Sequence, residues 1–307
     1  ISNRGAILSE DLSCYKQVIV LGIGKAAAMM AAATEQVLED DITSGLVITK
    51  YDNSVETKKI KVMEAGHPLP DENSVRGAEV LTQLASEADD KTLIINLISG
   101  GGSALFCLPA GTLTLADKIQ ATKLLLASGA DIDEMNCVRK HLSRVKGGGL
   151  AKIAYPAKLI NLILSDVISD RIDTIASGIT APDPTTFGDA LAIARKYSLE
   201  NKLPPAVMEH LRQGAKGIIP ETPKENDPAF KNTANIILGN NTLACQAALT
   251  EAKNFGYGAQ ILTTTLTGEA AEAGMMFARK AGDLITDKSG AAKNFLLLSG
   301  GETTVTV

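Results

Sequence analysis

Five short polar segments each come directly after an apolar, strand-like run and hold most of the residues that could do chemistry. They are Gly22-Ile23-Gly24-Lys25, Ser99 to Ser103, Ser165-Asp166, Gly239-Asn240-Asn241 and Ser299 to Glu302. In open α/β sheets, ligands bind beyond the carboxyl ends of the strands, where loops and helix N-termini meet. The spacing therefore predicts one polar rim at that edge of a sheet.

The stretch VIVLGIGKAAAMM places a lysine in an unusual position. Val18 to Leu21 predict a buried strand, Gly22 and Gly24 a tight turn, and the Ala- and Met-rich run from Lys25 a helix. Lys25 thereby adds positive charge to the first helical turn, where the macrodipole is already positive and free N–H groups attract an anion. Two interpretations stay open: Lys25 faces a bound anion, or it extends into water from an ordinary turn.

The segment SGGGS, which comprises Ser99, Gly100, Gly101, Gly102 and Ser103, follows the apolar run LIINLI. Consecutive glycines cost backbone entropy, so they are expected where the main chain adopts unusual dihedral angles or approaches a ligand closely. Successive N–H groups in such a turn form a nest for a phosphate or carboxylate. We interpret the segment as an anion-binding loop. The alternatives are a flexible surface turn and a nucleophilic Ser103, which lacks the G-x-S-x-G elbow.

A second glycine triplet follows a basic segment, NCVRKHLSRVKGGGLAK. Its cations include Arg139, Arg144 and Lys146. Cations in a last helical turn interact favourably with the helix dipole, which is a purely structural interpretation. In the functional interpretation, the glycines allow close approach of a ligand and Lys146 supplies charge. His67 in GHPLPD is likewise either a ligand contact or a hydrogen-bonding partner that stabilises its loop.

The segment SDVISD places carboxylates just past another predicted strand. Oxygen ligands in such a position suit Mg²⁺, which commonly takes one or two protein carboxylates together with phosphate oxygens and water. Asp166 is the preferred ligand because it lies next to the strand end. The structural alternative is a helix N-cap.

These residues together favour phosphoryl transfer, because such catalysis consists mostly of positioning and charge neutralisation. No Cys or His stands out as a nucleophile. Lys25 is expected to face the anion, and Asp166 is expected to bind the metal. The candidate phosphate- and substrate-binding residues are Gly22, Gly24, Ser99, Gly100, Gly101, Gly102, Ser103, Arg139, Lys146, Asn240, Gly300, Gly301 and Glu302.

Composition and charge exclude several classes of partner. The net charge is −5 with both signs interspersed, so nucleic acid is not expected as a partner. The longest apolar runs are too short to cross a bilayer. Four cysteines are scattered without metal spacing, which indicates a reducing compartment and a cytoplasmic location. A homodimer is left open.

Short Val- and Ile-rich runs alternate with helical patterns, which predicts an α/β fold with a Rossmann-like parallel sheet. The segment IIPETPKENDPAF is rich in proline and charge and is interpreted as a tether between domains. We therefore expect an N-terminal domain over residues 1–231 and a second α/β domain over 232–307. The chain stops within the strand-like run TTVTV, so the second domain is expected to be truncated.

With these residues laid out, the chain resembles the glycerate 2-kinase family of the MOFRL type, some bacterial members of which are labelled hydroxypyruvate reductases. The resemblance implies phosphorylation of D-glycerate to 2-phosphoglycerate with ATP and a divalent metal, in a cleft between two α/β domains. It also implies catalytic roles for Lys25 and Asp166, with the Ser99 to Ser103 loop in the same site. The matching stretches are LGIGKAAAMMA, EAGHPLPDE, LISGGGSALF, RKHLSRVKGGGLA, LILSDVISD, IASGITAPDPTTF, LGNN and LSGGETTVTV.

The chain departs from the family pattern at Ser169, where glycine is usual, and at Ile179, where proline is usual. The family also continues past T-V-T-V into a glycine-rich segment with an arginine implicated in catalysis, so this chain alone is expected to be inactive. Two other functions are kept as alternatives. One is an NAD-dependent hydroxypyruvate reductase, based on Gly22, Gly24 and Ala27 with Asp52 as ribose partner. The other is a module that binds small anions without turnover.

Overall fold

The structure is a computed structural model that describes residues 2–3, 6–7, 10–286 and 294–305. The chain forms two compact units. The first comprises Ile1–Ile163 and Arg171–Ile236, and the second comprises Leu164–Asp170 and Ile237–Val307. The α/β class is confirmed. The boundary expected at residue 231 stays a prediction, and the last two residues of TTVTV lie outside the described residues.

The first unit is built on a six-stranded sheet in the order β5-β4-β3-β6-β7-β8. Neighbours from β5 through β7 pair in parallel. β6 is buried along its whole length, as expected for a central strand of a parallel sheet with both faces covered. The strands are β3 (Gln17–Ile23), β4 (Ser44–Lys50), β5 (Ile60–Ala65), β6 (Thr92–Ile98), β7 (Lys158–Leu164) and β8 (Thr233–Gly239), and a short antiparallel pair, β1 (Ser2–Asn3) and β2 (Ala6–Ile7), precedes them.

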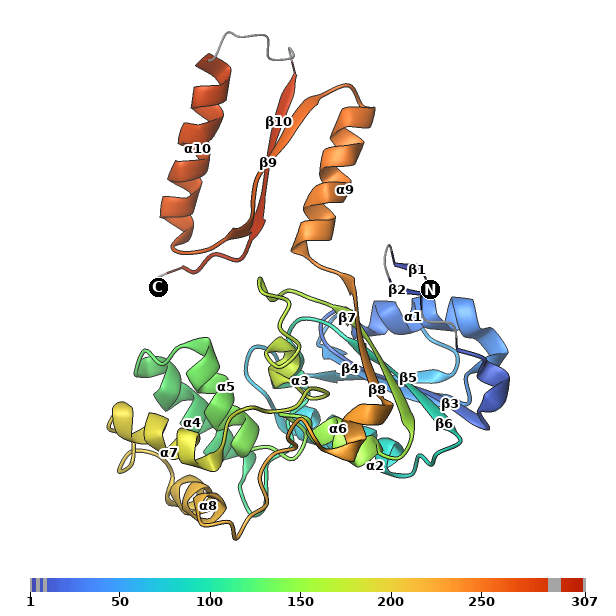
Figure 1. Ribbon diagram of the computed structural model, residues 1–307, viewed down its shortest axis with the longest axis vertical. Coiled ribbons are helices and arrows are strands. Elements are labelled where there is room, and N and C mark those ends of the chain that lie inside the picture. Colours follow the sequence, from blue (N-terminus) through green and yellow to red (C-terminus); the bar gives the residue numbers. More distant parts are fainter. Residues whose placement is uncertain (1, 4–5, 8–9, 287–293, 306–307) are drawn as a thin grey trace. The chain divides into compact units, whose positions relative to one another are not determined.

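Helices cover both faces of this sheet. α1 (Ala27–Leu38) connects β3 to β4, whereas α2 (Glu72–Ser86) connects β5 to β6 and so crosses the sheet in the opposite sense. Right-handed crossovers therefore place the two helices on opposite faces. α6 (Gly149–Ala154), which precedes β7, contacts α2 and shares its face (Figure 1). The sequence HPLPDE predicts that Asp71 caps the helix that follows, and Asp71 does begin α2, with a capping box.

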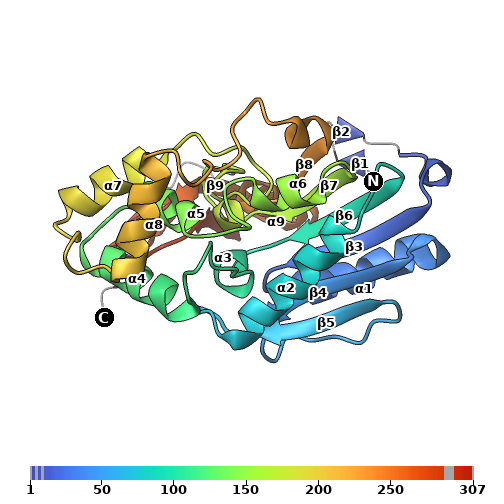
Figure 2. The ribbon, with the colours of Figure 1, turned by 90° about the horizontal axis from the view of Figure 1, so that it is seen from below.

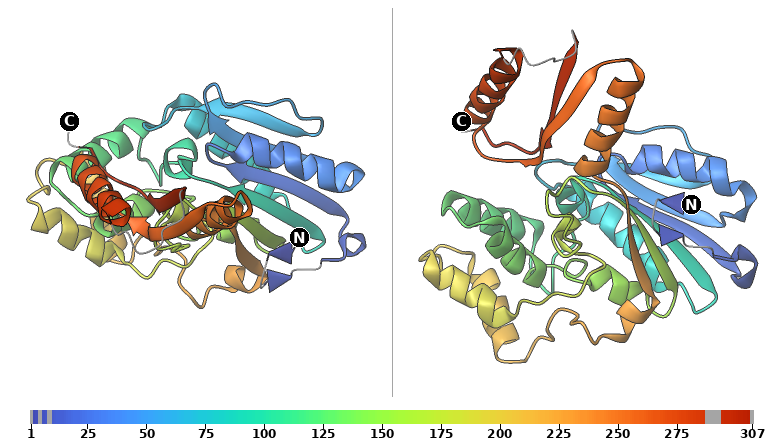
Figure 3. Two further views of the ribbon diagram at one scale, coloured as in Figure 1. Left: turned by 90° about the horizontal axis from the view of Figure 1, so that it is seen from above. Right: turned by 45° about the horizontal axis from the view of Figure 1, so that its top comes forward.

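A group of helices with its own apolar core lies to one side of the sheet (Figures 2 and 3). The chain reaches it from the end of β6 through the short helix α3 (Gly102–Leu105). The core side chains include Leu125, Val138, Phe187 and Leu211. Its members are α4 (Leu115–Ala127), α5 (Ile132–His141), α7 (Phe187–Lys196) and α8 (Pro205–Ala215), of which α7 and α8 were not anticipated from the sequence.

The described part of the second unit contains a parallel pair, β9 (Gly258–Leu266) and β10 (Phe295–Gly301). α9 (Asn241–Asn254) packs against both strands (Figure 1). α10 (Ala270–Thr286) follows β9. The sequence predicts the strands AQILTTT and FLLLS and helices over residues 242–255 and 269–285, and these elements match that prediction.

Two segments differ from expectation. The sequence predicts a helix from Asp133 to Val145 that ends at the second glycine triplet, whereas α5 ends at His141. The Ala110 amide donates to the Leu142 carbonyl at 3.2 Å, and the Arg144 amide donates to the Leu108 carbonyl at 3.1 Å. This pairing pulls the chain out of the helix.

The proline-rich segment interpreted as a tether packs against the first unit, where the Pro223 carbonyl accepts from the Asp183 amide at 3.0 Å. Within the described ranges no helix is long and apolar enough to cross a membrane.

A buried amide pair fastens the middle of the sheet. Asn96 Nδ2 donates to Asn161 Oδ1 at 2.8 Å, and Asn161 Nδ2 donates to the Ala234 carbonyl at 3.1 Å. Both asparagines are fully buried. These two hydrogen bonds link β6, β7 and β8 through side chains, in addition to the backbone hydrogen bonds between the strands.

We expect Asn161→Leu to lower the free energy of unfolding by roughly 1–3 kcal/mol, because the change leaves buried polar groups on both neighbouring strands unpaired. Urea denaturation measures the loss. Asn201→Leu, in an exposed turn, serves as the control and is expected to change stability by less than about 0.5 kcal/mol. Equal effects of the two substitutions would contradict a role for the amide pair.

Candidate active site

Two glycine-containing turns at the ends of β3 and β6 are hydrogen-bonded to each other. The Lys25 amide donates to the Gly100 carbonyl at 2.8 Å, and the Ala26 amide donates to Ser99 Oγ at 3.0 Å. Gly24 has φ of +128°, and a Cβ added there would lie 2.2 Å from Ser99 Oγ. Only glycine fits at this position, because the second turn occupies the space of any side chain. The structure thus brings Lys25 and the SGGGS segment together.

The amide groups of the first turn are all used inside the protein. Those of Lys25 and Ala26 bond the second turn, the Gly24 amide donates to the Ile48 carbonyl at 3.1 Å, and the Ala27 amide donates to the Gly24 carbonyl at 3.1 Å. Gly22 lies inside β3, and a Cβ there would lie 2.8 Å from the Val47 side chain. The phosphate contacts expected of Gly22 and Gly24 therefore have no geometric support.

The SGGGS segment has the opposite arrangement. Its first amide, that of Ser99, donates to the Ile23 carbonyl at 3.0 Å. Among the residues that the structure describes, the amides of Gly100, Gly101, Gly102 and Ser103 donate to no protein acceptor. These free donors follow directly after the buried strand β6 and open α3, so they could bind an anion.

Lys25 and His67 lie beside these free amides. Gly101 has φ of +87°, and a Cβ added there would lie 3.2 Å from Lys25 Cγ and 3.1 Å from His67 Nε2. The backbone of Lys25 is held at both ends, because its carbonyl also accepts from Asn53 Nδ2 at 2.9 Å, whereas its side chain is exposed. A fixed backbone with a free ammonium group suits a residue that neutralises charge on a ligand.

A strained turn closes the other side of the SGGGS segment. Ala176 and Ser177 adopt left-handed conformations, with φ of +51° and +60°. Ser177 Oγ lies 2.8 Å from Ser103 Oγ and donates to Asn136 Oδ1 at 3.0 Å. Left-handed conformations at non-glycine residues cost on the order of 1–3 kcal/mol each and cluster at functional sites. Sequence reasoning missed Ser177 and Asn136, because nothing in their spacing marks them.

Lys146 lies under this segment rather than at a helix terminus. It follows α5 in a loop whose next residues are bonded to the strained turn, with the Gly147 amide donating to the Ser177 carbonyl at 3.1 Å. Its ammonium group is buried and donates to the carbonyl of Ser103 at 2.9 Å and to that of Phe106 at 3.4 Å. Lys146 therefore holds α3 in place. Any charge that it supplies to a ligand acts through the Ser103 carbonyl side of the SGGGS segment, without direct contact.

Lys146 belongs to a cluster of three cations with Lys118 and Arg139. In the described part of the chain, none of them forms an ion pair with a carboxylate. Burial, together with a smaller effect of the nearby Arg139 charge, lowers the pKa of Lys118 to about 8. The pKa of Lys146 is well below its usual value, first because of burial and then because of Arg139 and Lys118. Burial also lowers the pKa of Arg139.

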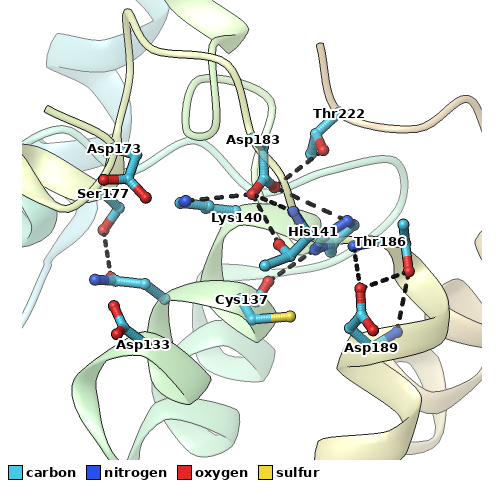
Figure 4. A network of polar contacts seen from close by, with 12 residues as sticks. Asp133, Cys137, Lys140, His141, Asp173, Ser177, Asp183, Thr186, Asp189 and Thr222 are labelled. Atoms are coloured by element: carbon cyan, nitrogen blue, oxygen red, sulfur yellow. Dashed lines mark hydrogen bonds and ion pairs between the residues drawn. The ribbon is translucent and has the colours of Figure 1, made fainter. Parts of the chain in front are cut away.

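A separate network fastens the end of α5 through a buried carboxylate (Figure 4). Asp183 is fully buried and accepts from Lys140 Nζ at 3.2 Å, from Thr185 Oγ1 at 2.7 Å and from Thr222 Oγ1 at 3.0 Å. His141 Nε2 lies 4.0 Å from Asp183 Oδ2. The carboxylate thus joins α5, the segment before α7 and the proline-rich segment.

The remaining predicted residues belong to the second unit. Asp166 is exposed on the segment 164–170. The other carboxylate of SDVISD, Asp170, has φ of +52° and accepts from Asn240 Nδ2 at 2.5 Å through Oδ2. Its Oδ1 is buried and has no hydrogen-bond partner among the described residues. Asn240 caps α9 by accepting from the Leu243 amide at 2.8 Å.

The glycines of SGGE are packed closely. A Cβ on Gly300 would lie 2.3 Å from Asn241 Oδ1, and one on Gly301 would lie 2.1 Å from the Leu266 carbonyl oxygen. Packing against α9 and β9 therefore explains both glycines without a ligand. Glu302 is exposed.

The chain is similar to several known proteins over most of its length. The family described as "Domain of unknown function (DUF4147)" matches residues 2–212. The chain is 44% identical over 305 residues to glycerate 2-kinase of Pyrococcus horikoshii, which covers 98% of this chain and 67% of the relative. A relative from Agrobacterium vitis with a provisional hydroxypyruvate reductase name is 42% identical over 289 residues, which cover 94% of this chain and 64% of the relative.

The fold is also similar to solved structures. The crystal structure of glycerate kinase from Thermotoga maritima matches with a TM-score of 0.83 and 40% identity, over 95% of this chain and 67% of that one. The chain therefore spans about two thirds of the length of these relatives.

We expect Asp183→Asn to lower the free energy of unfolding by roughly 3–5 kcal/mol, because it leaves the buried ammonium of Lys140 without its counter-charge. Asp133→Asn is the control: it removes an exposed ion pair with Arg171 and is expected to cost about 1 kcal/mol or less. Chemical denaturation of both variants tests this, and a small effect at Asp183 would show that the network is not a structural hub.

The lowered pKa of Lys118 predicts how the free energy of unfolding changes with pH. Its folded pKa of about 8 lies below the unfolded value near 10.5, so the unfolded state binds the extra proton between these pH values. The contribution of Lys118 to stability therefore rises with pH, by roughly 3 kcal/mol between pH 8 and 10.5. The difference in unfolding free energy between the parent protein and Lys118→Met measures this rise. A difference that is flat over that range would rule out the lowered pKa.

Proposed function

The chain belongs to the glycerate 2-kinase family, and from this membership we propose that the protein phosphorylates D-glycerate to 2-phosphoglycerate with ATP as the phosphoryl donor. The names of the glycerate kinase relatives indicate the substrate and the class of reaction.

The observation that carries the proposal is the pairing of Lys25 with the SGGGS segment. Free main-chain amides from Gly100 to Ser103 point to an anion site, and the exposed ammonium of Lys25 lies beside Gly101. In the transition state of phosphoryl transfer, negative charge spreads over the transferred group, and fixed donors and cations stabilise it. We assign the amides to hold phosphate or carboxylate oxygens and Lys25 to neutralise the transferring group.

The dinucleotide alternative has weaker support. In a Rossmann site, the amides of the first glycine turn and of the following helix bind the pyrophosphate. Here the amides from Gly24 to Ala27 are engaged within the protein, and Ser99 Oγ occupies the start of α1. The G-x-G-x-x-A pattern is explained by the contact between two protein turns, which leaves hydride transfer without a cofactor site at this position.

The second unit could hold Mg²⁺. Asp170 offers a buried oxygen without a partner, and Asp166 lies four residues earlier on the same segment. Within the described ranges, no group of three or more His, Cys, Asp or Glu side chains could bind a metal. One or two carboxylates fit Mg²⁺, which takes its other ligands from phosphate oxygens and water. When bound, the ion would neutralise phosphate charge. We assign Asp170 to it alongside Asp166.

Other expectations stay predictions: a cytoplasmic location, the absence of a nucleic-acid partner and a possible homodimer. The free cysteines Cys14, Cys107, Cys137 and Cys245 are consistent with a reducing compartment.

The direct test incubates the full-length protein with D-glycerate, ATP and MgCl₂ and follows ADP release, while ³¹P NMR distinguishes 2- from 3-phosphoglycerate. A parallel reaction contains hydroxypyruvate and NADH. Formation of 2-phosphoglycerate supports the kinase. NADH oxidation without ADP release supports the reductase, and D-glycerate binding without turnover supports the binding module.

We expect Lys25→Met to lower kcat by roughly 10²- to 10³-fold, the size of effect seen when one transition-state donor is removed. The unfolding free energy should change by less than about 0.5 kcal/mol, because the side chain is exposed. Lys61→Met, an exposed lysine on β5, is the matched control and should keep full activity. Full activity of Lys25→Met would remove this residue from the mechanism.

A further inference from the structure

A small cavity of about 50 Å³ lies beside the SGGGS segment in the first unit. One water molecule needs roughly 10–15 Å³ of such space, so the cavity has room for a small polar group. Its lining includes Pro68, Ser103, Cys107, Lys118, Arg139 and Lys146. Ser103 is thus shared between the cavity and the free amides of the SGGGS segment.

The cations of this cavity have more hydrogen-bond donors than the protein satisfies. Lys118 is 7% exposed, and its ammonium donates to the Leu142 carbonyl at 3.1 Å. An ammonium group has three donors and a guanidinium group has five. Within the described residues, Arg139 makes no side-chain hydrogen bond and no ion pair. Lys118 and Arg139 therefore present unused donors to the cavity.

The charges also lack compensation. Buried cations are normally paired, because a charged group that loses its hydration without gaining a counter-charge is destabilised. Asp183, a fully buried carboxylate, pairs with Lys140 and not with this cluster. The lowered pKa values of Lys118 and Lys146 are the electrostatic consequence. An anion in the cavity would relieve the mutual repulsion of the three cations.

We propose that this cavity binds the carboxylate of the acid substrate, with Arg139 and Lys118 as its donors. This inference depends on the proposed function, because a 2-hydroxy acid supplies both the carboxylate and the hydroxyl group to be phosphorylated. The planar fork of Arg139 matches a carboxylate in two parallel hydrogen bonds. The cavity favours this group over a phosphoryl group because of its small volume and its apolar wall at Pro68.

Binding there also orders the substrate. The hydroxyl at C2 is on the carbon next to the carboxylate, so it lies closer to the anchor than the hydroxyl at C3 does. Ser103 lies two residues after Gly101, which contacts Lys25. A carboxylate held in the cavity therefore directs the C2 hydroxyl toward the SGGGS segment and Lys25. Lys146, which is engaged with the Ser103 carbonyl, supports the loop and contributes charge from behind.

Isothermal titration calorimetry with D-glycerate, D-lactate and glycerol tests the proposal on the purified protein. D-glycerate and D-lactate should bind and glycerol, which lacks the carboxylate, should not. Arg139→Gln and Lys118→Met should each weaken D-glycerate binding by roughly ten- to a hundredfold, the effect of losing one charge-assisted hydrogen bond. Lys123→Met, an exposed lysine on the same helix α4, is the matched control and should bind like the parent.

Two further readouts separate direct contact from a structural role. Lys118→Met removes a buried charge, so it should remain folded at pH 7, and circular dichroism checks this. In the parent, binding at pH 8.5 should take up protons, because the anion raises the pKa of Lys118; titration in two buffers of different ionisation enthalpy measures this uptake. The uptake should fall in Lys118→Met. A folded variant with unchanged affinity and unchanged uptake overturns the proposal.

The outcomes distinguish this inference from the proposed function. If the full-length protein phosphorylates D-glycerate but Arg139→Gln and Lys118→Met bind it normally, the function stands and the carboxylate site is wrong. If acid binding depends on both residues but no phosphorylation occurs, the site stands and the kinase assignment is wrong. If neither acid binds the parent protein, or glycerol binds as well as D-glycerate, the inference is overturned.

Discussion

The contact between two glycine-containing turns is the constraint on which the rest of the site depends. Ser99 accepts from the amide of Ala26 through its side chain, and Gly100 accepts from the amide of Lys25 through its carbonyl. These bonds use the donors of one turn and leave those of the other free. They also fix the backbone of Lys25 while its side chain stays exposed. Charge and donors meet because the ends of β3 and β6 are neighbours in the sheet.

The first unit contains two different groups of buried and half-buried charges. Around Asp183, cation and carboxylate are matched and further bonded by hydroxyl groups, which is the arrangement expected of a structural network. Around the small cavity, three cations are gathered without a carboxylate. Both arrangements occur at the two sides of α5, since Arg139 and Lys140 are adjacent in its last turn. The presence of a carboxylate partner makes the first group a structural network, and its absence makes the second group a candidate anion-binding site.

Much of the fold could be predicted from the sequence, because strand and helix patterns alternate and glycines mark their junctions. The apolar run TLIINLI is a buried central strand, and Asp71 caps α2 as its sequence predicts. The helices α7 and α8 were not anticipated. They lie between the SDVISD segment and the proline-rich segment, in a part of the chain that carries no catalytic motif. The end of α5 was placed too late because the competing partner of Arg144, the Leu108 carbonyl, is distant in sequence.

The site could be predicted only in part. Lys25 and SGGGS stood out by residue type, and the structure brings them together. The same reasoning gave Gly22 and Gly24 a ligand role, whereas they accommodate the neighbouring strand and turn. Asp166 was preferred over Asp170 by its distance from the strand end, but burial, which a sequence does not show, distinguishes Asp170. Lys118 carries no motif, and only the fold places it near Arg139.

The close fit of Gly24 against Ser99 has a consequence for divergence within this protein lineage. Because the main-chain carbonyl of Ser99 as well as its hydroxyl fills the volume that a methyl group on Gly24 would need, no smaller residue at position 99 makes room for a side chain at position 24. The glycine should therefore persist wherever the loop after β6 keeps this path, whichever residue follows the strand. A dinucleotide fingerprint at this place in a related chain would then be a sign that the adjoining loop is present, rather than a sign of the ligand for which such fingerprints are usually searched.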